Sequence, residues 1–121
     1  MTTKISGYLG TYTKATSEGV YQFTLDLDQE QIVDVTPVAK VDNPTYLTLS
    51  AENQFLYAVS KEADQGGVTA FSIDQVTGGL NKLNSLTLPG SPPCHVSVNK
   101  ENTIVVTANY HTKQIVSYLI N

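Results

Sequence analysis

The apolar residues of this 121-residue chain fall in short runs that recur at turn-like intervals. Gly, Pro, Asn or Asp bounds most of the runs, which are too short for helices and fit strands. No segment has a convincing helical period. The pattern predicts ten strands, at 5–12, 18–26, 32–41, 44–50, 54–60, 67–74, 79–88, 93–99, 103–109 and 114–120.

The runs also repeat along the chain. Residues 44–60 align with 93–109 at an offset of 49 residues without a gap, and 68–74 align with 115–121 after a two-residue deletion. A third, partial copy lies upstream within residues 8–26. Four short antiparallel strands in a repeat of this length are typical of a β-propeller blade.

The predicted fold class is therefore all-β, with about two and a half blades. Residues 1–42 would supply the last three strands of a first blade, 43–91 a complete blade, and 92–121 the first three strands of a third. Three partial blades cannot close a ring of at least four. We therefore expect either the front piece of a longer protein or a chain that closes with copies of itself.

Composition and charge narrow the classes of partner. Seven lysines and no arginine stand against 11 acidic residues, for a net charge of -4, which disfavours binding to nucleic acid. The single cysteine, Cys94, cannot form an internal disulfide, and the N-terminal segment lacks the apolar stretch of a signal peptide or membrane span. A cytoplasmic protein with no membrane partner is expected.

Six motifs follow one another along the chain: Gly10-Thr11-Tyr12-Thr13, Gly19-Val20-Tyr21-Gln22-Phe23, Asn43-Pro44-Thr45-Tyr46-Leu47, Phe55-Leu56-Tyr57-Ala58-Val59, Pro93-Cys94-His95-Val96-Ser97-Val98 and Ala108-Asn109-Tyr110. In this order and spacing they resemble the N-terminal part of the seven-bladed propeller lactonases, the family of the bacterial 6-phosphogluconolactonases. The resemblance covers essentially the whole chain and implies a complete protein of roughly 340 residues.

The resemblance implies hydrolysis of 6-phosphogluconolactone to 6-phosphogluconate in the pentose phosphate part of carbohydrate metabolism, with a sugar lactone as partner and no cofactor. The His, Arg and Glu proposed as catalytic in that family belong to later blades. We therefore assign no catalytic residue, and we expect this chain alone to be inactive. Two loops, at 60–62 and 111–113, depart from the family pattern and weaken the transfer of rim contacts. The alternative is a non-catalytic propeller module that binds a protein or sugar.

His95 is the foremost candidate at the mouth of the central channel, because it begins an inner strand. Two interpretations stay open: a partly buried histidine hydrogen-bonded between blades, or a substrate contact near the channel. Tyr46 holds the same position in the preceding repeat, so both side chains are expected to fill one niche. Hydrolysis of a phosphorylated lactone also requires a cationic clamp, and we interpret Lys61, Lys100 and Lys113 as scattered surface residues.

Four further residues lie near the same mouth. Asn43 and Tyr110 could offer an amide and a hydroxyl there, or serve as a turn residue and a filler between blades. Cys94 precedes His95 on a strand, so the two point to opposite faces, and a buried structural cysteine is expected. His111 is expected to be exposed, and its spacing from His95 does not match a metal site.

Two glycine pairs are expected to form turns, and the exposed strand edges are expected to promote association. Gly66-Gly67 and Gly78-Gly79 are predicted to form hairpin turns, because neither pair opens a helix as a phosphate loop does. Residues 26–34 form an acidic hairpin to which we assign no calcium. Isolated blades would expose strand edges and apolar faces, so this segment is expected to self-associate or to need the remaining blades.

Overall fold

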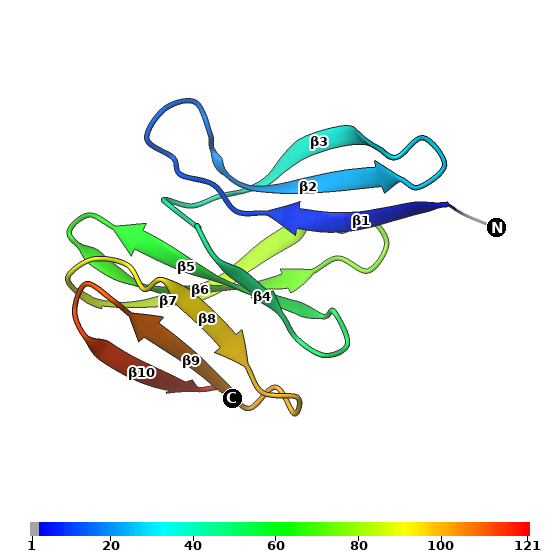
Figure 1. Cartoon of the computed structure of the whole chain (residues 1–121). Coiled ribbons are helices and arrows are strands. Elements are labelled where there is room, and N and C mark those ends of the chain that lie inside the picture. The colour runs from blue at the N-terminus through cyan, green and yellow to red at the C-terminus, as the bar shows by residue number, and fades with distance from the viewer. Residues whose placement is uncertain (1–2) are drawn as a thin grey trace.

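A computed structural model describes residues 3–121, which contain ten strands and no helix (Figure 1). None of these residues lies in a helix long and apolar enough to cross a membrane. The strands are β1 (Lys4–Leu9), β2 (Gly19–Asp26), β3 (Gln31–Lys40), β4 (Leu47–Leu49), β5 (Phe55–Glu62), β6 (Gln65–Ile73), β7 (Leu80–Pro89), β8 (His95–Val98), β9 (Ile104–Asn109) and β10 (Gln114–Leu119).

The strands form three antiparallel sheets, and every pair of hydrogen-bonded neighbours is consecutive in the sequence. The first blade is β1-β2-β3, the second is β4-β5-β6-β7 and the third is β8-β9-β10. Figure 1 shows the three sheets stacked one after another, with the blue first blade above and the red end of the third below. The inner strands β4 and β8 contact each other. This arrangement confirms the all-β propeller class predicted from the repeat.

The second blade is buried on both faces because successive residues of β5 point to opposite neighbours. Leu56 and Ala58 pack toward the first blade, where Tyr8 is among their partners. Tyr57 and Val59 pack toward the third blade, in a cluster that includes β8 and β9 side chains. A strand alternates its side chains between two faces, so four consecutive apolar residues are needed when both faces are covered. Fully burying each large side chain contributes about 1.5–3 kcal/mol.

Equivalent residues of the repeat form the same side-chain to backbone hydrogen bonds in the turns. The Ser50 Oγ accepts two successive backbone N–H groups at 3.2 and 3.1 Å, and the Asn99 Oδ1 accepts two at 2.8 and 3.0 Å. Three residues later, Asn53 and Asn102 adopt left-handed φ angles of 58° and 57°. Both turns thus use a side-chain acceptor followed by a residue that tolerates this conformation.

Two equivalent tyrosines tie each blade to the next. The Tyr57 hydroxyl donates to the Asn102 Oδ1 at 2.6 Å, and the Tyr8 hydroxyl donates to the Gly78 carbonyl at 2.6 Å. Burial raises the pKa of both phenols, and the Asn102 hydrogen bond partly offsets the rise for Tyr57. The blades are therefore joined by polar ties as well as by apolar packing.

The glycine pairs do not behave alike. Gly78 lies in the turn between β6 and β7 with a φ of 77°, as predicted. The prediction for Gly66-Gly67 is wrong, because both lie within β6 and pair with β5. A Cβ on Gly67 would collide with the Leu86 carbonyl, so the strand needs a residue without a side chain there. The turn itself lies earlier, where Ala63 has a φ of 55°.

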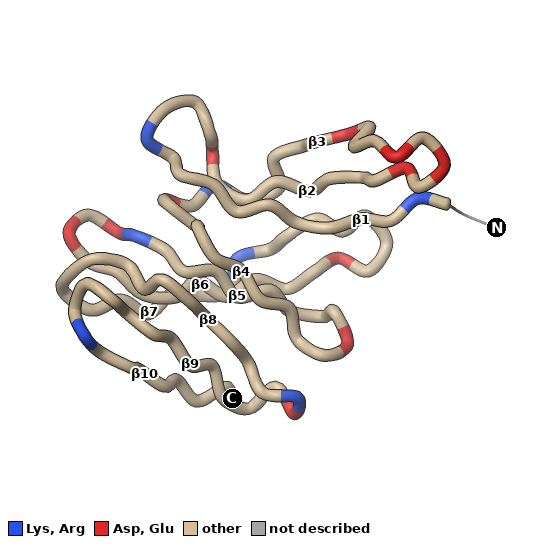
Figure 2. Tube along the Cα trace, viewed as in Figure 1, with Lys and Arg blue, Asp and Glu red and all other residues tan. Residues whose placement is uncertain are grey.

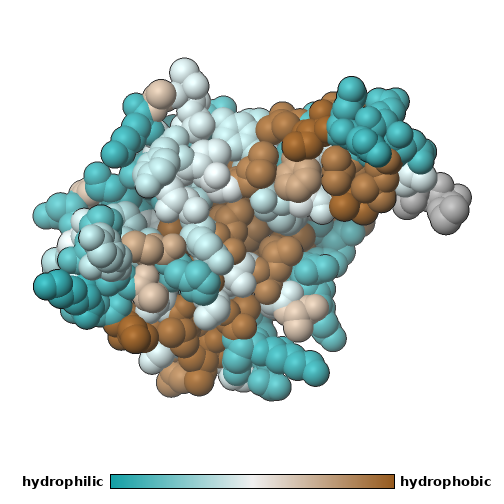
Figure 3. All heavy atoms as spheres, in the orientation of Figure 1, coloured by the Kyte–Doolittle hydropathy of each residue, from teal (hydrophilic) through white to brown (hydrophobic). Residues whose placement is uncertain are grey.

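Apolar side chains remain exposed on the outer blades. Ile115 and Leu119 of β10 are each 80% exposed, and Ile32, Val33 and Val35 of β3 are about half exposed. Figure 3 shows brown apolar atoms reaching the surface over parts of the first and third blades. Charged residues lie mainly in the turns and at strand ends, with acidic residues gathered at the turn between β2 and β3 (Figure 2). The faces that adjoining blades would cover are thus poor in charge.

Candidate functional site at one end of the blades

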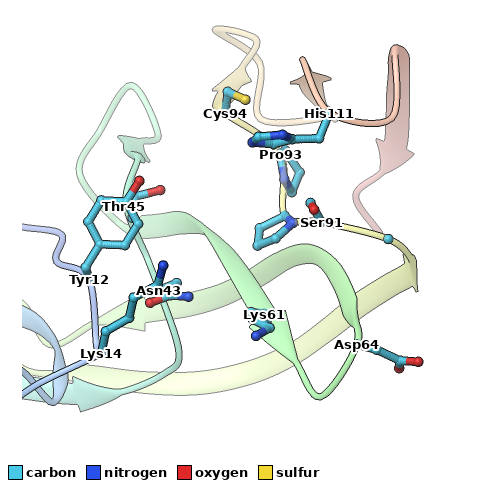
Figure 4. A pocket seen from close by; sticks show the side chains of 12 residues that line it. Tyr12, Lys14, Asn43, Thr45, Lys61, Asp64, Ser91, Pro93, Cys94 and His111 are labelled. Carbon is cyan, nitrogen blue, oxygen red and sulfur yellow. The ribbon is translucent and has the colours of Figure 1, made fainter.

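The antiparallel order brings two kinds of connection to the same end of each blade. One kind leads from the outer strand of a blade to the inner strand of the next, and the other joins β1 to β2, β5 to β6 and β9 to β10. Together they enclose a groove of about 850 Å³ (Figure 4). Its lining residues are Tyr12 and Lys14 of the first blade, Asn43 and Thr45, Lys61 and Asp64 of the second blade, Gly90 to Cys94, and His111 of the third.

Asn43 fixes the connection between the first two blades. Its Oδ1 accepts the Thr13 N–H at 2.9 Å, and its own N–H donates to the Thr13 Oγ1 at 3.1 Å. Asn43 has a left-handed φ of 48°, which asparagine tolerates better than most residues. The next residue toward the N-terminus, Asp42, accepts the Lys61 N–H through its carbonyl at 3.0 Å. Asn43 is thus a turn residue that also lines the groove.

The two aromatic candidates of the inner strands lie together. The rings of Tyr46 and His95 have centroids 4.3 Å apart and planes inclined by 43°. Both side chains are exposed, whereas Val96, the next residue along β8, is buried. Of the two interpretations of His95, the partly buried histidine hydrogen-bonded between blades does not match the structure, in which His95 is exposed and contacts the Tyr46 ring. The substrate contact stays a prediction. The pair lies one residue beyond Thr45 and Cys94, which line the groove.

The expectation that Cys94 is buried is also wrong. Cys94 is exposed and lines the groove, although its backbone N–H donates to the Ala108 carbonyl at 2.9 Å. It comes directly before β8, where the chain is still opening onto the groove, so no adjacent strand covers its side chain. Thr45, at the equivalent position in the preceding repeat, lines the groove in the same way.

Tyr110 and His111 lie in the loop after β9. Tyr110 is 80% exposed and meets His111 edge to face at 5.2 Å, so it does not fill a gap between blades. His111 is exposed and lines the groove. Asn109 shapes this loop, since its Oδ1 accepts the N–H groups of His111 and Thr112 at 2.9 and 3.1 Å. The loop therefore presents an imidazole to the groove, but it leaves the phenol in solvent.

Two lysines that sequence reasoning did not bring together, Lys14 and Lys61, both line the groove. Lys61 lies on β5, and Lys14 lies in the loop between β1 and β2, with its Nζ 5.5 Å from the Tyr12 ring centroid. Lys100 and Lys113 lie outside the groove lining. No sequence signal points to Lys14, because its loop has no counterpart of equal length in the other repeats. In the part of the chain that the structure describes, no three His, Cys, Asp or Glu side chains are placed to hold a metal ion.

Comparison with known proteins agrees with the fold and the repeat. Residues 6–121 match the model of the lactonase family with a seven-bladed β-propeller. The chain belongs to this family. It is 45% identical over 113 residues to the 6-phosphogluconolactonase of Bacillus subtilis, a match that covers 93% of this chain and 32% of that protein. The chain therefore spans about a third of the length of this relative.

Solved structures of other proteins are also similar to this chain in fold. A protein from Lactobacillus plantarum is 38% identical, with a TM-score of 0.86, and the match covers 98% of this chain and 36% of that one. The periplasmic gluconolactonase of Pseudomonas aeruginosa also has a TM-score of 0.86, over 98% of this chain and 35% of that one. Its identity of 22% shows a shared fold alone.

Proposed function

We propose that this chain is the N-terminal segment of a propeller lactonase that hydrolyses a six-carbon sugar lactone, with 6-phosphogluconolactone as its substrate. Residues 1–42, 43–91 and 92–121 would then supply parts of three consecutive blades. The segment would build one sector of the channel mouth, and the remaining blades would supply the groups that activate water. The protein would act in the cytoplasm, in carbohydrate metabolism.

One observation carries this proposal: a groove of about 850 Å³ lies at the end of the blades where the inner strands begin. Its volume falls within the range usual for small-molecule sites. Its walls combine cations, hydroxyl groups and an imidazole, which suit a polar, anionic sugar derivative. The similarity to a 6-phosphogluconolactonase supports the choice of lactone.

The chain itself offers few groups for the chemistry. Lactone hydrolysis needs a base to activate water and donors that stabilise the oxyanion. His95 and His111 are the two imidazoles of the chain, and both are exposed. Neither donates a hydrogen bond to a carboxylate among residues 3–121, so neither is oriented as a general base. We therefore assign these residues to substrate contact rather than to proton transfer.

A lactone-hydrolysis assay on two proteins tests the proposal. The full-length protein is expected to hydrolyse 6-phosphogluconolactone, and the separate 121-residue segment is expected to be inactive. A full-length protein that hydrolyses no sugar lactone but still binds a sugar or a protein would replace this proposal with the non-catalytic module. A segment as active as the full-length protein would contradict the assignment of catalysis to the missing blades.

A further inference from the structure

We propose that Lys14 and Lys61 form a phosphate subsite in the groove, which binds the phosphate group of a phosphorylated sugar lactone. The inference rests on the proposed function for the identity of the sugar. It does not depend on that function for the cationic site itself. The two lysines come from different blades and lie 47 positions apart in the sequence, yet both line one groove.

Hydrogen bonds tie the segments that contain Lys14 and Lys61 to the connection between the first two blades, at residues 42 and 43. Thr13, next to Lys14, bonds to Asn43 through its backbone N–H at 2.9 Å and its hydroxyl at 3.1 Å. Lys61 bonds through its backbone N–H to the Asp42 carbonyl at 3.0 Å. The two lysines are therefore positioned by adjacent residues, 42 and 43. A binding site prepared in this way loses less conformational freedom when the ligand arrives.

Neither ammonium group is neutralised by the protein. Among the described residues, no ion pair joins Lys14 or Lys61 to a carboxylate, and the Lys14 Nζ lies 5.5 Å from the Tyr12 ring centroid. Asp64 is the single carboxylate of the groove lining, and Figure 4 shows it turned away from Lys61. Two lysines against one aspartate give the groove a net positive charge in a chain whose net charge is -4. Hydrogen bonds between ionised donors and phosphate oxygens are the strong kind.

Neutral donors complete the site. The hydroxyl groups of Thr45 and Ser91 line the groove, and neither donates or accepts a hydrogen bond within residues 3–121. His111 lines the same wall. Thr45 directly precedes the exposed Tyr46, whereas Lys14 and Lys61 lie toward the loops. A bound sugar would thus place its phosphate at the rim and its ring toward the inner strands.

Lys61 also borders a second, smaller groove of about 350 Å³ with Lys40 and Lys82. Two carboxylates, from Asp42 and Glu62, line that groove and offset its charge. Its lining includes Lys40 of β3 and Lys82 of β7, the outer strands of two blades, whereas the larger groove reaches Cys94, directly before the inner strand β8. The smaller groove is therefore less suited to a ligand that must reach the channel, and Lys82 provides a matched control.

The test uses the full-length protein and two lactones that differ only by the phosphate group, 6-phosphogluconolactone and gluconolactone. We expect Lys14→Gln and Lys61→Gln each to lower kcat/KM for the phosphorylated lactone by about ten-fold, mainly through KM. The value for gluconolactone should stay within about two-fold, because its hydrolysis does not use the subsite. Lys82→Gln and Lys100→Gln should behave as the wild type. Raising the salt concentration should weaken the wild type more than the variants.

The outcomes separate this inference from the proposed function. Equal losses on both lactones, or no loss on either, would overturn the phosphate subsite and leave the lactonase activity in place. If the wild type hydrolyses neither lactone, the proposed function fails, and calorimetric titration with 6-phosphogluconate decides the subsite. Binding that the Lys14→Gln/Lys61→Gln double variant loses supports it. Binding equal in both proteins, or absent from the wild type, overturns it.

Discussion

Tyr46 and His95, which occupy the same position in successive repeats, have ring centroids 4.3 Å apart and ring planes inclined by 43°. They meet because both lie at the start of an inner strand, and the inner strands β4 and β8 contact each other. The repeat thus brings equivalent residues of two blades into direct contact. The aromatic pair joins the blades at the end that carries the groove.

The contact between Tyr46 and His95 should contribute a small but measurable coupling free energy to stability. In the full-length protein, we expect Tyr46→Ala and His95→Ala to show a coupling free energy of about 0.5–1.5 kcal/mol in a double-mutant cycle. Denaturant unfolding gives the free energies. Ser97→Ala, on the same face of β8 but without a ring contact, is the control. Strictly additive losses would show that the rings are neighbours without mutual stabilisation.

The same two variants report on the function of the pair. Because both side chains are exposed, removing them should change the melting temperature little. A contact with the sugar ring would instead appear as a higher KM for the lactone. An unchanged KM in the full-length protein would show that the pair does not contact the sugar and only joins the two blades.

The tie between the second and third blades can be tested by removing one atom. Tyr57→Phe deletes the hydroxyl that donates to Asn102 at 2.6 Å and leaves the buried ring in place. We expect the free energy of unfolding to fall by about 0.5–1.5 kcal/mol. Tyr110→Phe is the matched control, because Tyr110 is 80% exposed. Similar values for the two variants would argue against the tie.

The turn between β6 and β7 should make stability depend on pH. Hydrogen bonds from the N–H groups of Thr77 and Val76 lower the pKa of the Asp74 carboxyl below its ordinary value. A carboxylate with a lowered pKa stabilises the fold above the ordinary range of aspartate, and this contribution disappears as the pH falls through the lowered pKa.

The corresponding measurement compares melting temperatures across pH. Asp74→Ala should melt below the wild type at neutral pH, and the two curves should converge in acid. Asp74→Asn, which retains an acceptor oxygen without the charge, should lie between them. A constant difference at all pH values would assign the effect to the side chain's shape rather than to its charge.

Gly10 controls how closely the first blade approaches the groove. A Cβ at this position would collide with the Pro44 carbonyl, in the connection that Asn43 anchors. We expect Gly10→Ala to cost about 1–3 kcal/mol by overpacking. Gly79→Ala is the control, because the Cβ would meet only the Thr77 Oγ1, at 3.2 Å. Equal stability of the two variants would show that the connection can shift freely.

The separate 121-residue segment should associate with itself. The outer edge of β10 is unpaired in the described sheet, and Ile115 and Leu119 on this strand are each 80% exposed. Such edges and faces promote pairing between chains. Light scattering on a sizing column should give an oligomer, and replacing both residues with lysine should favour the monomer. A wild-type segment that stays monomeric at high concentration would contradict this prediction.

Much of the fold could be predicted because the repeat imposes the same strands twice. Strand boundaries agree to within a few residues where turns contain strong signals, as at Asn53 and Asn102. The prediction failed at Gly66-Gly67, where glycine serves the close approach of a neighbouring strand rather than a turn. A sequence pattern cannot distinguish these two uses, because both depend on the absence of a Cβ.

The candidate site was less predictable than the fold. The repeat identified Tyr46 and His95 as equivalent positions, but it did not predict that their rings touch. The prediction that Cys94 is buried failed, since the exposure of Cys94 depends on the groove that other loops enclose. Lys14 was missed for the same reason: it lines a groove together with Lys61 only after two blades have packed together. Three-dimensional neighbours of this kind have no fixed spacing in the sequence.

The strictly sequential strand order has a consequence for synthesis on the ribosome. Each blade pairs only strands that are adjacent in the chain, so a blade can form as soon as its own residues have emerged. The second blade, however, needs both neighbours to cover the two faces of β5. A nascent chain of this length would therefore have one blade covered on both faces, between two blades that each leave a face uncovered. Rapid synthesis of the following blades would shorten the time in which these faces can aggregate.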